Sequence, residues 1–126
     1  MAHAISWFEI PANNFDRAMK FYGAVLEADL QTEDRGTRVL AYLPASRDEV
    51  GGAIVHVHDE SLGYKPAHSG SVVYLNGGDD LSVPLARVEA AGGKILIPKT
   101  DLGQGFGYIA FFEDTEGNRV GFYSMS

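Results

Sequence analysis

The same order of sequence patterns occurs twice along this chain, and that repeat constrains the fold more than any other feature. Each half begins with a strand-like apolar run, continues into a helix-like segment, and ends in three further strand-like runs. In the first half these segments cover residues 4–10, about 15–27, 29–34, 37–44 and 50–58. In the second half they cover residues 71–76, about 81–91, 94–99, 106–113 and 119–124. The sequence therefore predicts two consecutive βαβββ modules.

The two predicted helix starts determine how the halves align. Asn14 precedes the first apolar residue of one helix, and Asp80 precedes that of the other; both residue types favour the N-cap position. Aligning them gives an offset of 66 residues and pairs Trp7 with Val73. We expect one domain over residues 1–126. Its parts would be module 1 (about 1–58), a polar linking loop (59–70) and module 2 (about 71–126).

Composition narrows the possible partners. A chain of 126 residues is long enough for one hydrophobic core. Its net charge of −7 opposes binding to nucleic acid or to an anionic membrane surface. The absence of cysteine excludes disulfides, thiolate metal sites and cysteine nucleophiles. The sequence shows neither a basic segment followed by an apolar run at its start nor a long apolar stretch, so we expect a cytoplasmic protein with a small-molecule ligand.

Four segments carry a resemblance to a known family. They are Trp7–Pro11, Asn14–Tyr22, Ala86–Lys94 and Gly107–Gly121. In order and spacing they resemble the vicinal oxygen chelate superfamily, also described as glyoxalase, bleomycin-resistance and extradiol-dioxygenase proteins, over nearly the whole chain. The resemblance implies an α+β fold in which two tandem βαβββ modules form a curved mixed sheet around a cleft, usually completed in a homodimer. The superfamily includes lyases, isomerases, dioxygenases and drug-sequestering proteins, so the fold alone does not give the function.

The resemblance also implies where a metal ion would bind. Metal-dependent members place a His, Gln or Glu seven residues before the helix cap, and a Glu four residues after the last turn glycine. In this chain those positions hold Trp7, Val73, Val55 and Gly121, whose side chains cannot bind a divalent cation. Among their neighbours only His56 is a strong donor, and strand alternation would point it away from the cleft. We therefore expect no metal and no other cofactor.

Glu9 is the candidate catalytic residue. It follows Trp7 by two positions and so shares its side of the first strand, the side that faces the cleft by the resemblance. A carboxylate on an apolar cleft wall can act as a general base. It can also accept a hydrogen bond from a ligand, or form an ion pair with an arginine such as Arg38 or Arg119. The sequence leaves these roles open.

Aromatic residues of the strands form the candidate ligand-binding wall. Strand aromatics usually belong to the core, but some must face a cleft that strands line. Trp7 together with tyrosines would stack on a flat or ring-bearing ligand. The predicted binding set is Trp7, Glu9, Tyr42, Val73, Tyr108 and Tyr123.

Two functions are consistent with these patterns. The first is a metal-free cleft protein that binds a small, partly aromatic molecule, either to sequester it or to sense it. The second is an enzyme of lyase, isomerase or dioxygenase type, using Glu9 as a base or metal ligands relocated through His56. Binding requires only a shaped apolar wall, whereas catalysis requires an activated group.

Overall fold

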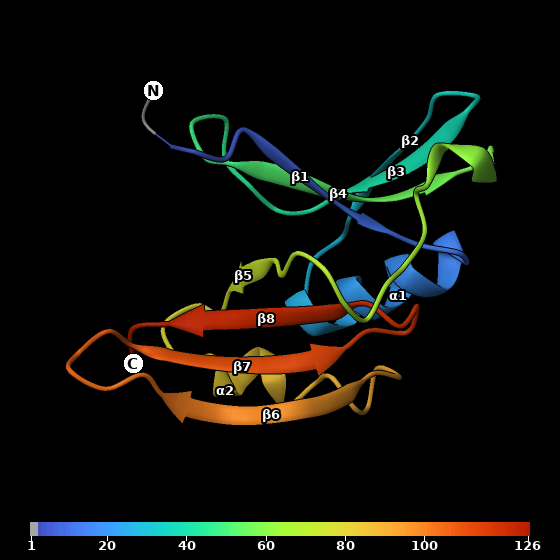
Figure 1. Cartoon of the computed structure of the whole chain (residues 1–126). Helices are drawn as coiled ribbons and strands as arrows, with labels where there is room; N and C mark the ends of the chain where they lie inside the picture. Colours follow the sequence, from blue (N-terminus) through green and yellow to red (C-terminus); the bar gives the residue numbers. More distant parts are fainter. Residues whose placement is uncertain (1–2) are drawn as a thin grey trace.

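The computed structural model describes residues 3–126, and Figure 1 shows the two modules as two sheets, one above the other. Module 1 contains β1 (Trp7–Pro11), α1 (Phe15–Leu26), β2 (Gln31–Asp34), β3 (Arg38–Tyr42) and β4 (Gly51–Val57). The linking loop carries a short 3₁₀ helix, η1 (Glu60–Leu62). Module 2 contains β5 (Tyr74–Asn76), α2 (Ser82–Leu85), β6 (Lys94–Asp101), β7 (Tyr108–Glu113) and β8 (Arg119–Ser124).

Each module forms its own mixed four-stranded sheet. Sheet A has the strand order β1-β4-β3-β2 and sheet B the order β5-β8-β7-β6. In both sheets the first strand pairs in parallel with the last strand of its module, and the remaining pairs are antiparallel. The predicted α+β fold of two βαβββ modules is confirmed.

Two strands begin later than the sequence predicts. β1 starts at Trp7 rather than at residue 4, since Trp7 pairs with Gly51, the first residue of β4. β5 covers only Tyr74–Asn76 rather than residues 71–76, and Tyr74 pairs with Gly121 of β8. A strand needs a hydrogen-bonded neighbour, so a β-prone sequence alone overestimates its length.

The first predicted helix is confirmed. The side chain of Asn14 accepts a hydrogen bond from the Arg17 amide at 3.0 Å, which makes it the N-cap of α1. The apolar spacing buries one side of the helix, namely Ala18, Phe21, Tyr22 and Val25. The helix ends at Leu26, and Glu27 follows in the left-handed conformation with φ 50°.

The second helix is shorter than predicted. Only Ser82–Leu85 is α-helical, whereas the periodic apolar residues suggested a helix over about 81–91. After Leu85 the chain continues in turns, with amide-to-carbonyl bonds of the tighter i→i−3 type such as Arg87 to Pro84 and Val88 to Leu85. These turns still bury Val88 completely, so the apolar periodicity is satisfied without a regular helix.

A single core joins the two sheets. It contains Ile10 and Ile54 from sheet A and Phe112 from sheet B, with α1 between them. The ring of Phe21 lies 5.9 Å from that of Phe112. We call the side of each sheet that meets this core its inner face and the opposite side its outer face.

Buried polar contacts tie α1 to module 2. The Tyr22 hydroxyl donates to Asp114 at 2.7 Å inside the core. Burial raises the pKa of Tyr22 well above its ordinary value, and the Asp114 carboxylate adds to this effect, so the hydroxyl keeps its proton. Glu116 accepts from the amides of Asn13 and Asn14 at 2.9 and 2.7 Å and from Arg17 Nε at 2.7 Å. The turn between β7 and β8 thus holds the start of α1.

Among the described residues, no helix is long and apolar enough to cross a membrane.

Candidate functional site

The outer face of sheet A carries a cluster of three predicted site residues. Trp7 is 44% exposed, and its indole Nε1 donates to Glu9 Oε2 at 3.2 Å. The rings of Trp7 and Tyr42 meet edge to face, with centroids 6.0 Å apart. The alternate residues Phe8 and Ile10 pack on the inner face, as period-two strand geometry requires. We call Trp7, Glu9 and Tyr42 the indole cluster.

Glu9 forms an ion pair with one of the two arginines considered from the sequence. Arg38 Nη1 lies 3.9 Å from Glu9 Oε2, the same oxygen that accepts from Trp7. The guanidinium of Arg38 also lies 5.4 Å from the ring centre of Tyr64. Glu9 Oε1 has no hydrogen-bond partner within residues 3–126 and is the oxygen left to accept a bond from a ligand.

The indole cluster rests on apolar residues and is bordered by charged ones. The outer face beneath it buries Leu40, Ala53, Val55 and Val57, with Tyr42 and Tyr64 packed against them. The Tyr42 hydroxyl donates to the Glu33 carboxylate, and this bond raises the pKa of Tyr42. The hydroxyl is therefore occupied, and the ring is the part of Tyr42 that can meet a ligand.

Tyr64 and Arg38 belong to this site, but the sequence analysis gave them no binding role. Tyr64 lies in the linking loop, where neither periodicity nor a motif marks it. A binding role for Arg38 could have been inferred from its position at the start of β3, because β3 pairs with β4, the strand that also pairs with β1 and so lies next to Glu9.

The outer face of sheet B carries a matching aromatic feature. Tyr74 of β5 lies over Gly121 of β8, where an added Cβ would come within 2.7 Å of the tyrosine ring and 3.2 Å of Phe111. Trp7 lies over Gly51 in the same way, with 3.0 Å to an added Cβ. The rings of Tyr74 and Phe111 are 5.6 Å apart. In each module an aromatic residue of the first strand thus covers a glycine of the last strand.

This arrangement corrects the assumption that Val73 is the counterpart of Trp7. The N-cap of α2 is Leu81, one residue later than the Asp80 from which the count was made. Seven residues before Leu81 is Tyr74, and a shift of one residue along a strand moves a side chain to the other face. Val73 accordingly packs against the core between the sheets.

The other two predicted tyrosines lie on opposite faces of sheet B. Tyr123 is on the outer face, in register with Asn76 of β5 and Ile109 of β7, and it lines a hollow of about 950 Å³. Tyr108 packs against the core on the inner face, with the Lys99 amine 4.4 Å from its ring centre. The structure therefore brings Trp7, Glu9 and Tyr42 together, places Tyr123 on the other sheet, and turns Val73 and Tyr108 inward.

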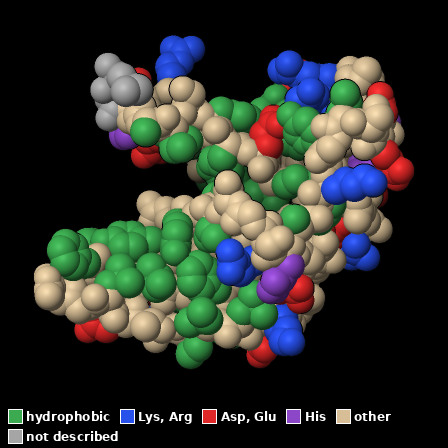
Figure 2. Space-filling view, in the orientation of Figure 1, with side chains coloured by type: hydrophobic (Ala, Val, Ile, Leu, Met, Phe, Trp, Pro, Cys, Tyr) green, Lys and Arg blue, Asp and Glu red, His purple; other side chains and the backbone are tan. Residues whose placement is uncertain are grey.

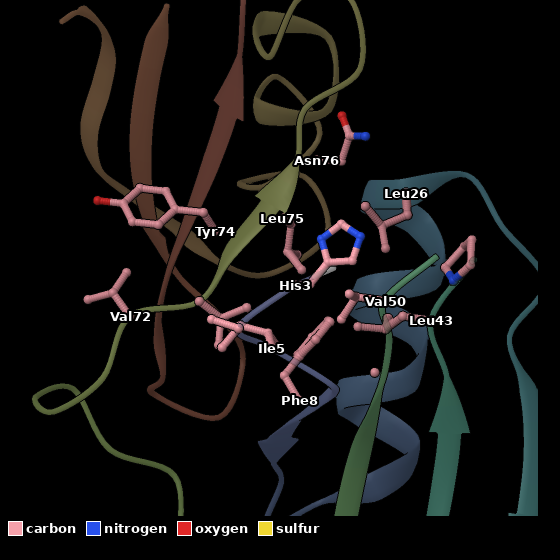
Figure 3. Close-up of a pocket in the computed structure, with 14 residues that line it drawn as sticks. His3, Ile5, Phe8, Leu26, Leu43, Val50, Val72, Tyr74, Leu75 and Asn76 are labelled. Atoms are coloured by element: carbon pink, nitrogen blue, oxygen red, sulfur yellow. The ribbon is translucent and has the colours of Figure 1, made fainter. Parts of the chain in front are cut away.

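A second hollow of about 930 Å³ opens between the inner faces of the sheets (Figure 3). Phe8 reaches into it from β1, Leu43 from the segment just after β3, Leu26 from the end of α1, and Leu75 from β5. Figure 2 shows the corresponding notch between the upper and lower parts of the molecule. Within residues 3–126, its lining contains no Asp, Glu, Lys or Arg side chain.

No group of three or more His, Asp or Glu side chains within residues 3–126 is arranged to hold a metal ion. His56 Nδ1 lies 2.8 Å from the Ala12 carbonyl oxygen and donates to it, which leaves Nε2 as its remaining nitrogen. The ring of His58 is 5.1 Å from that of His56.

Comparison with known proteins identifies the family. The family model of the Glyoxalase/Bleomycin resistance protein/Dioxygenase superfamily matches residues 4–122. The chain belongs to this superfamily. A glyoxylase-like domain-containing protein from Didymella fabae is 36% identical over 118 residues, which are 90% of this chain and 88% of that protein.

Several solved structures share the fold of this chain. A glyoxalase I mutant from Zea mays superposes with a TM-score of 0.71 at 22% identity; the alignment covers 94% of this chain but 45% of the maize chain. The antibiotic binding protein TnmS3 from Streptomyces sp. CB03234 gives a TM-score of 0.69 at 22% identity, covering 100% of this chain and 99% of that one. A glyoxalase/bleomycin resistance protein from the same Streptomyces gives 0.70 at 20% identity, covering 96% and 100%. At these identities the likeness concerns the fold.

Proposed function

We propose that this superfamily member binds a small, partly aromatic molecule and holds it without a metal ion or other cofactor, to sequester or sense it. The observation that carries the proposal is the indole cluster. It combines a 44% exposed indole, a second ring 6.0 Å away and a carboxylate beside them. Aromatic walls with a few placed polar groups are typical of small-molecule sites.

Glu9 serves this function as an anchor for the ligand. The indole N–H and the Arg38 guanidinium both face Oε2, which orients the carboxylate and leaves Oε1 toward the ligand. These contacts fit a fixed anchor for a bound ligand, and the fold shared with TnmS3, an antibiotic binding protein, agrees with a binding role.

The proposal is tested by titrating the protein with a panel of fused-ring aromatic compounds while following the fluorescence of Trp7, the only tryptophan. A bound ring should quench or shift this emission. Trp7→Ala should weaken binding by about 1–3 kcal/mol, measured by calorimetry, because an aromatic contact is lost.

Phe8→Ala is the matched control from the same strand. Phe8 packs on the inner face, so its loss should lower the free energy of unfolding by about 2 kcal/mol and leave ligand affinity unchanged. Unfolding by Trp7→Ala, with ligand loss confined to Phe8→Ala, would assign the site to the inner hollow and contradict the proposal.

We also propose that the cleft is completed in a cytoplasmic homodimer, in which the outer face of sheet B from one copy faces the indole cluster of the other. The support is a group of large apolar side chains left exposed on or beside sheet B, visible in Figure 2 over the strands β7 and β8. They are Tyr74, Ile97, Leu102, Phe106, Tyr123 and Met125, with exposed fractions of 36–63%.

Sedimentation equilibrium at tens of micromolar should give the mass of a dimer. Phe106→Asp places a charge in this apolar group and should give a monomer. Leu62→Asp is the control, since Leu62 is 58% exposed on η1, away from sheet B. A monomeric wild type, or equal effects of both variants, would contradict the dimer.

A further inference from the structure

We propose that Arg119, on the outer face of sheet B, binds the carboxylate of an aromatic ligand, so that the protein selects aromatic carboxylates over neutral aromatic compounds. This inference rests on the proposed function and names the ligand class. It starts from an unusual polar atom. Arg119 Nε is buried and has no hydrogen-bond partner, and it is the sole buried side-chain nitrogen or oxygen in this condition within residues 3–126.

A buried donor without a partner is expensive. Leaving one unsatisfied costs about 1–3 kcal/mol, and more when the group is charged. Folded proteins seldom keep such a group unless a ligand, ion or water completes it. Nε is closed to solvent, so an incoming anion would bind through the Nη atoms of the same guanidinium, whose paired N–H groups a carboxylate matches best.

The charges around Arg119 leave it available. Four other arginines form ion pairs within residues 3–126, namely Arg17, Arg35, Arg38 and Arg87. Arg119 forms none, although Glu113 is directly opposite it on β7. The Glu113 carboxylate is instead 3.4 Å from His68 Nδ1, on the linking loop. Glu113 is thus directed toward His68 and forms no ion pair with Arg119.

An aromatic surface lies next to this charge. The Arg119 guanidinium carbon is 5.9 Å from the ring centre of Phe111, whose ring meets Tyr74 above Gly121. Arg119 and Gly121 are on the same face of β8, two residues and therefore about 7 Å apart. A ligand ring stacked on Tyr74 and Phe111 would bring an attached carboxylate within reach of the guanidinium.

The missing side chain of Gly121 makes this arrangement possible. Any Cβ at that position would collide with the tyrosine ring at 2.7 Å. By the sequence resemblance, metal-dependent relatives place a glutamate there. With glycine at this position, the rings of Tyr74 and Phe111 can lie directly above β8. This pair of rings, with the Arg119 guanidinium beside it, occupies the place of that glutamate.

The test compares 2-naphthoate with its neutral analogue 2-naphthamide by titration calorimetry on the full-length protein. Wild type should bind naphthoate at least roughly tenfold more tightly, because a bidentate ionic hydrogen bond forms with the carboxylate only. Arg119→Met keeps an unbranched apolar stem and removes the charge. It should abolish the preference by weakening naphthoate alone. Arg47→Met, in the loop before β4, should change neither affinity.

The outcomes separate the two proposals. If neither compound binds, both this inference and the proposed function fail. Equal binding of both compounds to wild type overturns the inference alone, and it is the result expected if a carboxylate of the second copy occupies Arg119. If Arg119→Met binds neither compound, Arg119→Lys is measured in its place. A preference of this variant for naphthoate supports the inference, because lysine keeps the positive charge, and loss of the preference overturns it. A shift of the Arg119 Nε–Hε resonance on adding naphthoate, absent with naphthamide, supports it directly.

Discussion

The two helices begin at corresponding places in their modules but are anchored by different means. The start of α1 is held by Glu116, whose side chain is fully buried and belongs to the other module. The start of α2 is held by Asp80, whose side chain is 47% exposed and bonds to the Ser82 amide and to Lys99, and by the neutral Ser124 hydroxyl, which accepts from the Leu81 amide at 3.0 Å. The first helix runs for 12 residues and the second for four. The same order of elements therefore does not imply the same stability, because the charged anchor of α1 is shielded from water whereas that of α2 is exposed to it.

The largest expected difference follows from removing the two anchors in turn. Glu116→Ala leaves the amides of Asn13 and Asn14 without their buried acceptor, and it should lower the free energy of unfolding by about 3 kcal/mol. Urea denaturation at pH 7 measures this loss. Lys99→Met breaks the exposed anchor and should shift the denaturation midpoint far less. An equal shift in both variants would contradict the distinction between the anchors.

The pH dependence of the α1 anchor gives a second difference. Burial acts to raise the pKa of Glu116, but hydrogen bonds from Arg17, the Asn14 amide and Thr115 outweigh it and hold the pKa below its ordinary value. Because the pKa of Glu116 is lower in the folded than in the unfolded state, its charge stabilises the fold above about pH 4.3, the pKa of the unfolded state. This stabilisation is lost as the pH falls through the folded-state pKa.

Glu116→Gln should therefore be less stable than wild type at pH 6, and the gap should narrow as the pH falls toward 3. Urea midpoints across this range measure the effect, and the neutral amide keeps the size of the side chain. A gap that stays constant with pH would mean that the charge of Glu116 does not contribute.

The smallest expected effect concerns the α2 anchor. The Lys99 amine, together with the Ser82 amide, lowers the pKa of Asp80 to about 2. Lys99→Met removes the larger contribution, so the pKa of Asp80 should rise toward its ordinary value of about 3.9, stopping short of it because the Ser82 bond remains. Carboxyl-carbon NMR titration reads this directly. An unchanged pKa would show that the Lys99 contact does not persist in solution.

Local patterns predicted much of module 1 correctly. The cap at Asn14, the buried side of α1 and the alternation of Trp7 and Phe8 between the faces of β1 each depend on residues a few positions apart. The same reasoning assigned Val73 to the wrong face of module 2. Asp80 bonds to the Ser82 amide as an N-cap residue would, but the N-cap of α2 lies one residue later, at Leu81. Counting from Asp80 therefore selects Val73 instead of Tyr74, and neighbouring residues of a strand point to opposite faces.

The sequence by itself determined the order of elements, the two modules and their superfamily, because periodicity, caps and turns are local and recur along the chain. Only the tertiary structure decided which charges meet. Glu9 pairs with Arg38 rather than Arg119, Glu116 bonds to Asn14 across 102 residues of sequence, and Arg119 keeps a buried nitrogen without a partner among residues 3–126. Contacts of this kind depend on how the two sheets pack around α1, and that packing sets distances that no spacing along the chain specifies.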